Sequence, residues 1–174
     1  PEVIRGINAF AAGVNEVNPD ATVEVVWTFT WFGPEAETQA ANALLETGAD
    51  VLAQHQDSTA TGLAAEAAGA KWISYNTAYG KDSAPEAFVT APVWDWGPYY
   101  VDVVESIVDG TFSTESYWGG METGLVSLYD LSSDVPSDIA TLIGEKTDAI
   151  IDGTFDVEIV EEEFISNVIG TVNP

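Results

Sequence analysis

Cysteine is absent from the 174-residue chain, which excludes disulfides and thiolate metal sites. Histidine occurs once, as His55, and a single histidine without cysteine cannot build an ordinary zinc site. The phosphate-binding motifs G-x-G-x-x-G and G-x-x-x-x-G-K-[ST] are missing, as is the G-x-S-x-G elbow of many hydrolases. We therefore expect no metal, no cofactor and no catalytic residue of a recognisable kind.

Positive charge is scarce, with four Lys and Arg against 29 Asp and Glu and a net charge of −25. Such a surface repels phosphate backbones and anionic membranes, so we expect no nucleic acid as a partner. Acidity on this scale is typical of a solvated surface, as in salt-adapted proteins, and attraction of cations is the alternative. Long apolar runs are also lacking, because no stretch reaches the roughly 18 residues of a membrane span.

What is present is a regular alternation of helix and strand patterns. The expected helices cover 1–17, 34–48, 58–69, 97–110 and 136–153, and the expected strands cover 22–31, 49–54, 70–76 and 87–94. Residues 117–132 suit a short hairpin or edge strand, and 154–174 fit either a strand or a helix. Trp27 and Trp72 are interpreted as core.

This alternation, with short loops and continuous apolar strands, predicts the α/β class. We expect a three-layer α-β-α sandwich with a mainly parallel sheet, formed as a single domain over residues 1–174. In such a sheet, ligands bind beyond the carboxyl ends of the strands. The residues at those ends are Trp31 and Phe32, then His55, Gln56 and Asp57, then Tyr75, Asn76 and Thr77, and finally Trp94, Asp95 and Trp96.

These residue types suit a flat, polar ligand, because indoles stack and amides or carboxylates read the edge of a ring. The predicted ligand-binding residues are Trp31, Phe32, His55, Gln56, Asp57, Asn76, Trp94 and Trp96. Structural roles remain open for several of them. His55 can be a satisfied structural histidine, Asp57 can cap the helix that follows it, and Asn76 can simply shape a turn.

Several motifs carry a likeness that composition does not show. "WFGPEAE", "GADVLAQHQDS", "WDWGPYY", "YWGG" and "DGTFDV" occur in this order over about residues 1–155, and the chain resembles the basic membrane protein family. That resemblance implies a substrate-binding lipoprotein of an ABC importer with a type I, two-lobed periplasmic-binding-protein-like fold. The chain looks like the second lobe only, and the tail 156–174 has no counterpart that we assign.

The resemblance also implies a ligand class. Better-known members bind purine nucleosides between aromatic side chains, and Trp31 aligns with the stacking aromatic of the second lobe. Asn76 and Trp94 stand where nucleoside binders carry an acid and a lysine for the ribose. "HQDS" replaces a small, glycine-rich turn. These departures favour a bare base such as adenine, or another flat heterocycle, over a nucleoside.

The resulting hypothesis is one lobe of a binding protein that captures a small molecule and delivers it to an ABC permease. The full-length protein is then expected to be a periplasmic or extracellular lipoprotein, although no export signal begins this chain. A small α/β hydrolase or transferase that uses His55 and Asp57 is the alternative. A receiver-like domain with Asp57 as phosphoacceptor, and a homo-oligomer formed through exposed aromatic residues, also remain open.

Overall fold

The computed structural model of the protein describes residues 2–172, so the ends of the expected domain at 1 and 173–174 lie outside the described residues. The helices are α1 (Glu2–Val17), α2 (Pro34–Thr47), α3 (Ala60–Ala68), α4 (Gly80–Ser83), α5 (Gly97–Val108) and α6 (Ser137–Ile151), with a 3-10 turn η1 (Met121–Thr123). The strands are β1 (Val23–Val26), β2 (Val51–Ala53), β3 (Lys71–Ile73), β4 (Phe88–Thr90), β5 (Pro92–Trp94), β6 (Val126–Leu128) and β7 (Val168–Val172). Within residues 2–172, none of the helices combines the length and the apolar character needed to cross a membrane.

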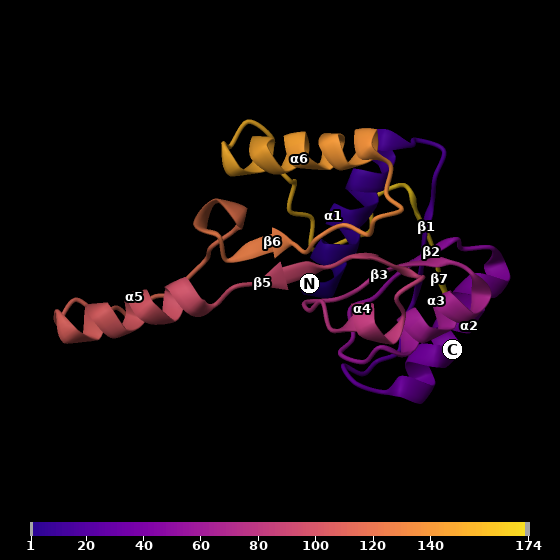
Figure 1. The fold of residues 1–174 in the computed structure, drawn as a ribbon, viewed down its shortest axis with the longest axis horizontal. Coiled ribbons are helices and arrows are strands. Elements are labelled where there is room, and N and C mark those ends of the chain that lie inside the picture. The colour runs from indigo at the N-terminus through magenta and orange to yellow at the C-terminus, as the bar shows by residue number, and fades with distance from the viewer. Residues whose placement is uncertain (1, 173–174) are drawn as a thin grey trace.

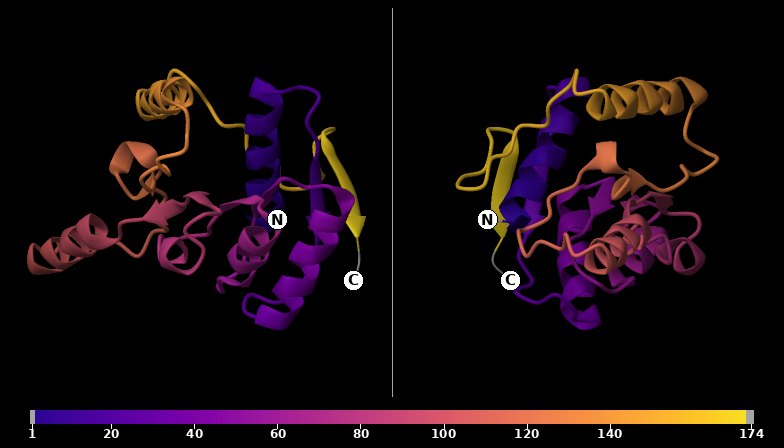
Figure 2. Two further views of the ribbon diagram at one scale, coloured as in Figure 1. Left: turned by 45° about the vertical axis from the view of Figure 1, so that its right-hand side comes forward. Right: turned by 90° about the vertical axis from the view of Figure 1, so that its left-hand side faces the viewer.

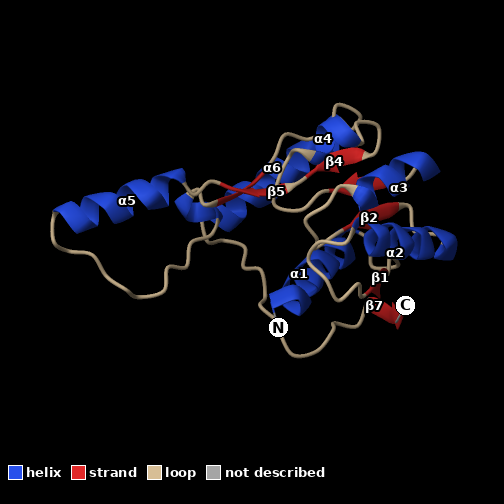
Figure 3. Ribbon diagram, turned by 90° about the horizontal axis from the view of Figure 1, so that it is seen from below, coloured by secondary structure: helices blue, strands red, loops and turns tan. Residues whose placement is uncertain are grey.

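The strands form three short ladders between helices. β2, β3 and β4 pair in parallel in that order, β1 pairs in parallel with β7, and β5 pairs antiparallel with β6. Figure 3 shows α2 and α3 on one side of these strands and α1 on the other. The α/β class with parallel strands is thus confirmed, but the strands do not join into one continuous sheet.

The first strand is shorter than expected, because it ends at Val26 rather than at Trp31. Phe29 adopts a left-handed backbone with φ of 54°, which strand geometry does not allow. The hydroxyl groups of Thr28 and Thr30 donate to the carbonyl oxygens two residues ahead, at 3.2 and 3.0 Å. Such local hydrogen bonds compete with strand pairing and turn residues 27–31 into a structured loop.

The expected strand over 87–94 is divided into β4 and β5 around Ala91. Pro92 has no N–H to donate to a ladder, which favours a break or an edge at this position. Beyond the break, β5 leaves the central ladder and pairs with β6. The expected edge strand within 117–132 is confirmed as β6.

The ambiguous tail is resolved as a loop that ends in a strand. Asn8, which is 2 % exposed in α1, donates to the carbonyl oxygens of Val160 and Glu163 at 2.9 and 2.8 Å. Its side-chain oxygen accepts from the amide of Ile165 at 3.1 Å. The tail then runs beside β1 as β7, so the segment without a recognised family counterpart is part of the fold (Figure 2).

Trp72 lies at the centre of the core. It is fully buried on β3 and packs edge-on against Phe88, with ring centroids 6.1 Å apart. Its indole N–H donates to the side-chain oxygen of Gln54 at 3.0 Å, which satisfies the one polar atom of the ring. The core interpretation of Trp72 is confirmed, whereas Trp27 is only half-buried and contacts Phe29 and Phe164.

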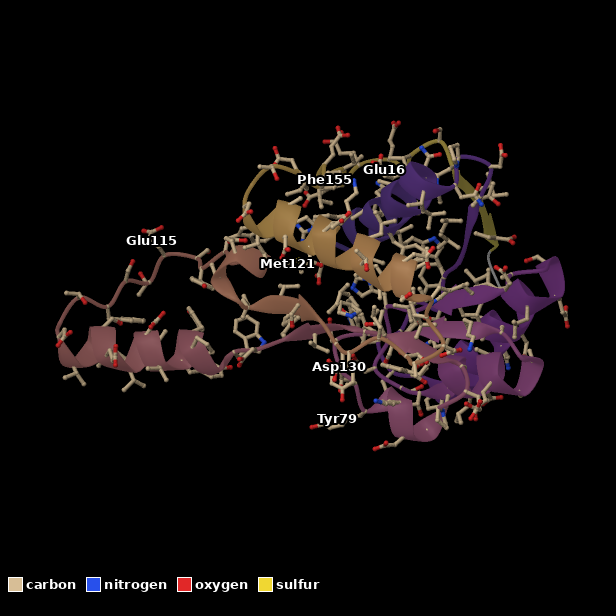
Figure 4. All side chains as sticks on the ribbon, turned by 45° about the horizontal axis from the view of Figure 1, so that its top comes forward. Glu16, Tyr79, Glu115, Met121, Asp130 and Phe155 are labelled. Atoms are coloured by element: carbon tan, nitrogen blue, oxygen red, sulfur yellow. The ribbon has the colours of Figure 1, made fainter. Side chains whose placement is uncertain are left out.

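α5 and α6 lie apart from this core. Neither helix contains a buried residue. α5 projects away from the other elements at the left of Figure 1. Lys146 connects α6 to α1. Its ammonium lies 3.2 Å from the carboxylate of Glu16 and 4.3 Å from the ring centre of Phe155. Glu16 and Phe155 are labelled in Figure 4.

Candidate functional site

The loop between β2 and α3 is organised by Gln54. Its amide nitrogen donates to the carbonyl oxygens of Gln56 and Ser58, at 2.8 and 2.7 Å. Its oxygen accepts from the buried Trp72 indole. Because two of these bonds hold the loop backbone and the third ties Gln54 to the core, Gln54 fixes the backbone that presents His55, Gln56 and Asp57.

A buried carboxylate supports the same loop from below. Glu37 is 1 % exposed, and its two oxygens accept from the amide of Gly33 at 2.9 Å and from the hydroxyl of Ser58 at 2.6 Å. The Ser58 hydroxyl oxygen also accepts from the amide of Ala60 at 3.2 Å. The N-cap of α3 is Thr59 and no side chain makes a capping hydrogen bond there, so the exposed Asp57 does not cap this helix.

Three rings gather at the carboxyl ends of the first strands, and we call Trp31, His55 and Tyr75 the aromatic edge. The His55 ring centre lies 4.4 Å from that of Tyr75 and 5.9 Å from that of Trp31. The amide of Asp57 donates to the carbonyl oxygen of Trp31 at 2.9 Å, which ties the two loops together. Trp31 is 55 % exposed, so its indole face is open to solvent.

Burial governs the titration of the two polar rings. Desolvation lowers the pKa of His55 below its ordinary 6.5, while the carboxylates of Glu2 and Asp57 oppose this shift. Desolvation also raises the pKa of Tyr75 above 10.0, and hydrogen bonding to Asn76 opposes that shift. At neutral pH both rings are therefore uncharged, which favours a neutral planar partner.

The remaining predicted residues near this edge differ in how far their side chains are already engaged within the chain. The Gln56 amide donates to the Thr28 hydroxyl at 2.9 Å, so part of its hydrogen-bonding capacity already serves the loop. Asn76 has φ of 56°, a turn conformation that asparagine tolerates well. Phe32 is 64 % exposed beside Trp31 in sequence. The backbone conformation thus shows the turn-shaping role of Asn76. Contact between Asn76 and a ligand stays a separate prediction.

Trp94 and Trp96 belong to a second group of rings. Their centroids are 5.4 Å apart, and Trp96 lies 5.8 Å from Tyr99 and 6.2 Å from Tyr100 at the start of α5. Tyr99 in turn lies 4.4 Å from Tyr117. Within residues 2–172, ring contacts join three of the four expected strand ends, and the Trp94 end forms its own cluster.

Two hollows on the surface of the described chain lie away from the aromatic edge. One hollow of about 360 Å³ lies at the start of α2, along Gly33–Ala36 and Gln39. A larger one of about 540 Å³ lies between β6 and α6. Trp31, His55 and Tyr75 line neither of these two hollows. No group of three metal-ligating side chains occurs among residues 2–172.

Two residues that shape the aromatic edge and its loop are not among the predicted ligand-binding residues. The strand pattern places Gln54 only at the end of the strand over 49–54, although a glutamine next to a histidine at a strand end indicates a polar loop. Tyr75 was placed at its strand end without a role, yet it makes the shortest ring contact with His55. Neither pairing can be seen in sequence spacing, because each depends on how neighbouring strands align.

Residues 1–159 match the family model described as ABC transporter substrate-binding protein, PnrA-like. The chain belongs to this family. Its members are substrate-binding proteins, and the predicted resemblance is confirmed over nearly the whole chain.

Two curated relatives and one solved structure show the range of similarity. The chain is 41 % identical over 156 residues to a purine-binding protein of Brucella abortus, covering 42 % of its length. It is 39 % identical over 157 residues to a Haloferax volcanii protein, a candidate ABC transporter glucose-binding protein, covering 40 % of its length. An ABC transporter solute-binding protein of Conexibacter woesei shares the fold, with a TM-score of 0.70, 24 % identity, and coverage of 85 % of this chain and 50 % of that one.

The chain therefore spans about two fifths of the length of these two curated relatives. The two relatives have nearly the same sequence identity to this chain, but their names give different ligand classes, a sugar and a purine. The family is thus shown, and the names of these relatives do not agree on one ligand class.

Proposed function

We propose that the protein is the ligand-capturing lobe of an ABC importer receptor and that it binds a flat heterocycle such as a purine base. The observation that carries the proposal is the aromatic edge, in which His55 lies between Trp31 and Tyr75. In its full-length form, the protein would be an extracytoplasmic lipoprotein that works with a membrane permease. The named members of its family support a binding role rather than catalysis.

The polar groups of the edge favour a heterocycle over a sugar. A sugar presents many hydroxyl groups, and each buried one needs a partner. Here the Gln54 amide is committed to the loop and to Trp72, and the Gln56 amide donates to Thr28. What remains is a stacking surface with a few polar groups at its border, which suits the face and edge of a purine.

The enzyme alternative would need His55 and Asp57 to work together. Asp57 is exposed, and within residues 2–172 its carboxylate makes no hydrogen bond to His55. Without such a bond, Asp57 does not orient the imidazole as a general base would require. We therefore assign neither residue a catalytic role.

Ligand-observed NMR with adenine, adenosine and glucose tests this proposal, because it detects the weak binding that an open half-site should show. We expect adenine to bind, glucose not to bind, and the Trp31→Ala variant to lose the adenine signal. Trp118→Ala is the matched control, because Trp118 is a 73 % exposed tryptophan that contacts Arg5 instead of His55.

Binding of glucose but not adenine would refute the heterocycle assignment. Conversion of any of these ligands to a product, abolished in His55→Ala, would refute the binding role itself. Equal adenine binding by Trp31→Ala and the parent chain would remove the aromatic edge as the site.

A further inference from the structure

The two loops that present the aromatic edge are joined to each other. They are the β1–α2 loop, which carries Trp31, and the β2–α3 loop, which carries His55. Two hydrogen bonds of 2.9 Å link them directly. The side-chain amide of Gln56 donates to the Thr28 hydroxyl, and the backbone amide of Asp57 donates to the carbonyl oxygen of Trp31. A third link runs through a side chain of α2.

Glu37 on α2 makes this third link. It is 1 % exposed, and its two carboxylate oxygens have different partners. One oxygen accepts from the amide of Gly33, the last residue of the β1–α2 loop, at 2.9 Å. The other accepts from the hydroxyl of Ser58 in the β2–α3 loop at 2.6 Å. A single buried carboxylate therefore bridges the two loops, with one oxygen bonded to each.

Stabilisation of α2 alone does not explain this burial. Glu37 lies in the first turn of the helix, where the helix dipole favours a carboxylate. Glu35 occupies the same turn and remains exposed, so the helix gains this benefit without burying an acid. The three ion pairs among residues 2–172 do not include Glu37, so its hydrogen bonds to the two loops must offset the loss of hydration.

We propose that Glu37 is a positioning residue of the candidate site, which sets the spacing of Trp31 and His55 without touching the ligand. Trp31 lies two residues before Gly33, and His55 lies three residues before Ser58, so the bridge holds both loops close to their rings. A stacking surface that is already in place loses less conformational entropy when a ligand binds. The effect on binding rests on the proposed function, whereas the effect on ring spacing does not.

The spacing of the rings can be measured without a ligand. Their centres lie 5.9 Å apart, so NMR should show a nuclear Overhauser cross-peak between the Trp31 indole and the imidazole of His55, the only histidine. We expect Glu37→Ala and Ser58→Ala to lose this cross-peak. Glu37→Gln should keep it, because its amide oxygen can accept from Gly33 while its NH₂ group donates to the Ser58 oxygen.

Two controls separate positioning from a general loss of stability. Glu35→Ala removes an exposed glutamate from the same helical turn. Thr90→Val removes a buried hydroxyl on β4 that donates to the carbonyl oxygen of Tyr129 at 2.7 Å, and it should destabilise the fold without reaching the two loops. Both variants should keep the cross-peak.

Adenine binding, followed by ligand-observed NMR, gives the functional readout. Glu37→Ala should weaken it about fivefold or more, because the stacking surface must then be ordered when the ligand binds. Glu37→Gln and Glu35→Ala should bind as the parent chain does. If the parent chain does not bind adenine but the cross-peak responds as expected, the proposed function fails and the positioning role stands.

A cross-peak that persists in Glu37→Ala would overturn the proposal, as would its absence from the parent chain. Its loss in Thr90→Val would show that it follows stability alone, and its loss in Glu37→Gln would show that the two hydrogen bonds are not what holds the rings. If Glu37→Ala does not fold, Ser58→Ala decides by the same criterion, because it removes only one end of the bridge.

Discussion

Single residues set the chemistry of the aromatic edge through their surroundings. His55 is held by the rings beside it and by the close approach of Gly6 on α1, where an added Cβ would lie 3.4 Å from the imidazole Cε1. Because Gly6 has no side chain, the imidazole ring can pack close to α1, where it loses part of its hydration. A histidine in this setting favours its neutral form, which can both donate and accept a hydrogen bond.

The pKa of His55 is the first prediction. Since burial lowers it below 6.5, the unfolded chain binds more protons between the two pKa values. The contribution of His55 to stability is therefore fully present above 6.5 and is lost as the pH falls through the folded pKa. Because the chain has one histidine, the imidazole proton signal in NMR reports this pKa without overlap.

We expect a titration midpoint below 6.5 in the folded chain and near 6.5 in urea. Asp57→Asn should lower the folded midpoint further, because it removes a carboxylate that favours the charged ring. Asp20→Asn, at an exposed position in the turn after α1, is the control and should have no effect. A folded midpoint at or above 6.5 would contradict the effect of burial.

At the scale of elements, α3 and β3 touch through a glycine. A Cβ at Gly62 would lie 2.3 Å from the Trp72 ring, whereas a Cβ at Gly13 on α1 would meet nothing within 4 Å. We predict that Gly62→Ala lowers the free energy of unfolding by at least about 1–3 kcal/mol through overpacking. Gly13→Ala should raise it by about 0.5–1 kcal/mol, because alanine favours a helix.

Urea unfolding of the two variants measures both effects. A Gly62→Ala variant as stable as the parent would show that α3 can move away from Trp72 without cost. The paired glycines make this comparison informative, because both substitutions are identical and both sites are helical.

The elements themselves were largely predictable, whereas their limits and partners were not. The helix over 136–153 was recognised from its apolar spacing, and Gly48 was recognised as a stop that the structure confirms with φ of 101°. Strand 22–31 was predicted too long, because β-branched and aromatic residues continue to Trp31 while threonine hydrogen bonds and the left-handed Phe29 end the strand earlier.

The candidate site was predictable to the extent that it follows strand ends. The rule that parallel strands present their carboxyl ends at one edge brought Trp31, His55 and Tyr75 together. It failed to anticipate the separate grouping of Trp94 and Trp96, because β5 leaves the central ladder after Pro92. Local composition cannot reveal which ladder a strand joins.

For the whole molecule, charge is the dominant property. Three ion pairs connect distant parts of the described chain, namely Arg5–Glu161, Lys71–Asp134 and Lys146–Glu16. All involve partly exposed side chains, so they contribute little in water. The repulsion among the many unpaired carboxylates is therefore the larger effect, and Glu115 on the loop beyond α5 illustrates how far this acidity extends (Figure 4).

We predict that salt stabilises the protein. Raising NaCl from about 0.1 to about 1 M shortens the screening length from roughly 10 to 3 Å and weakens repulsion between carboxylates. The thermal midpoint in scanning calorimetry should rise, and KCl at equal ionic strength should act alike because screening is not ion-specific. A midpoint that falls with salt would show that the ion pairs outweigh the repulsion.

The joining of β7 to β1 has a consequence for biosynthesis. The bond from Ile165 to Asn8 spans 157 positions, so α1 and the edge of β1 have no partner until the residues of β7 have left the ribosome. Contacts between such distant positions slow folding, and an unpaired edge invites association with other nascent chains. Assistance from a chaperone during translation would protect this edge until β7 emerges.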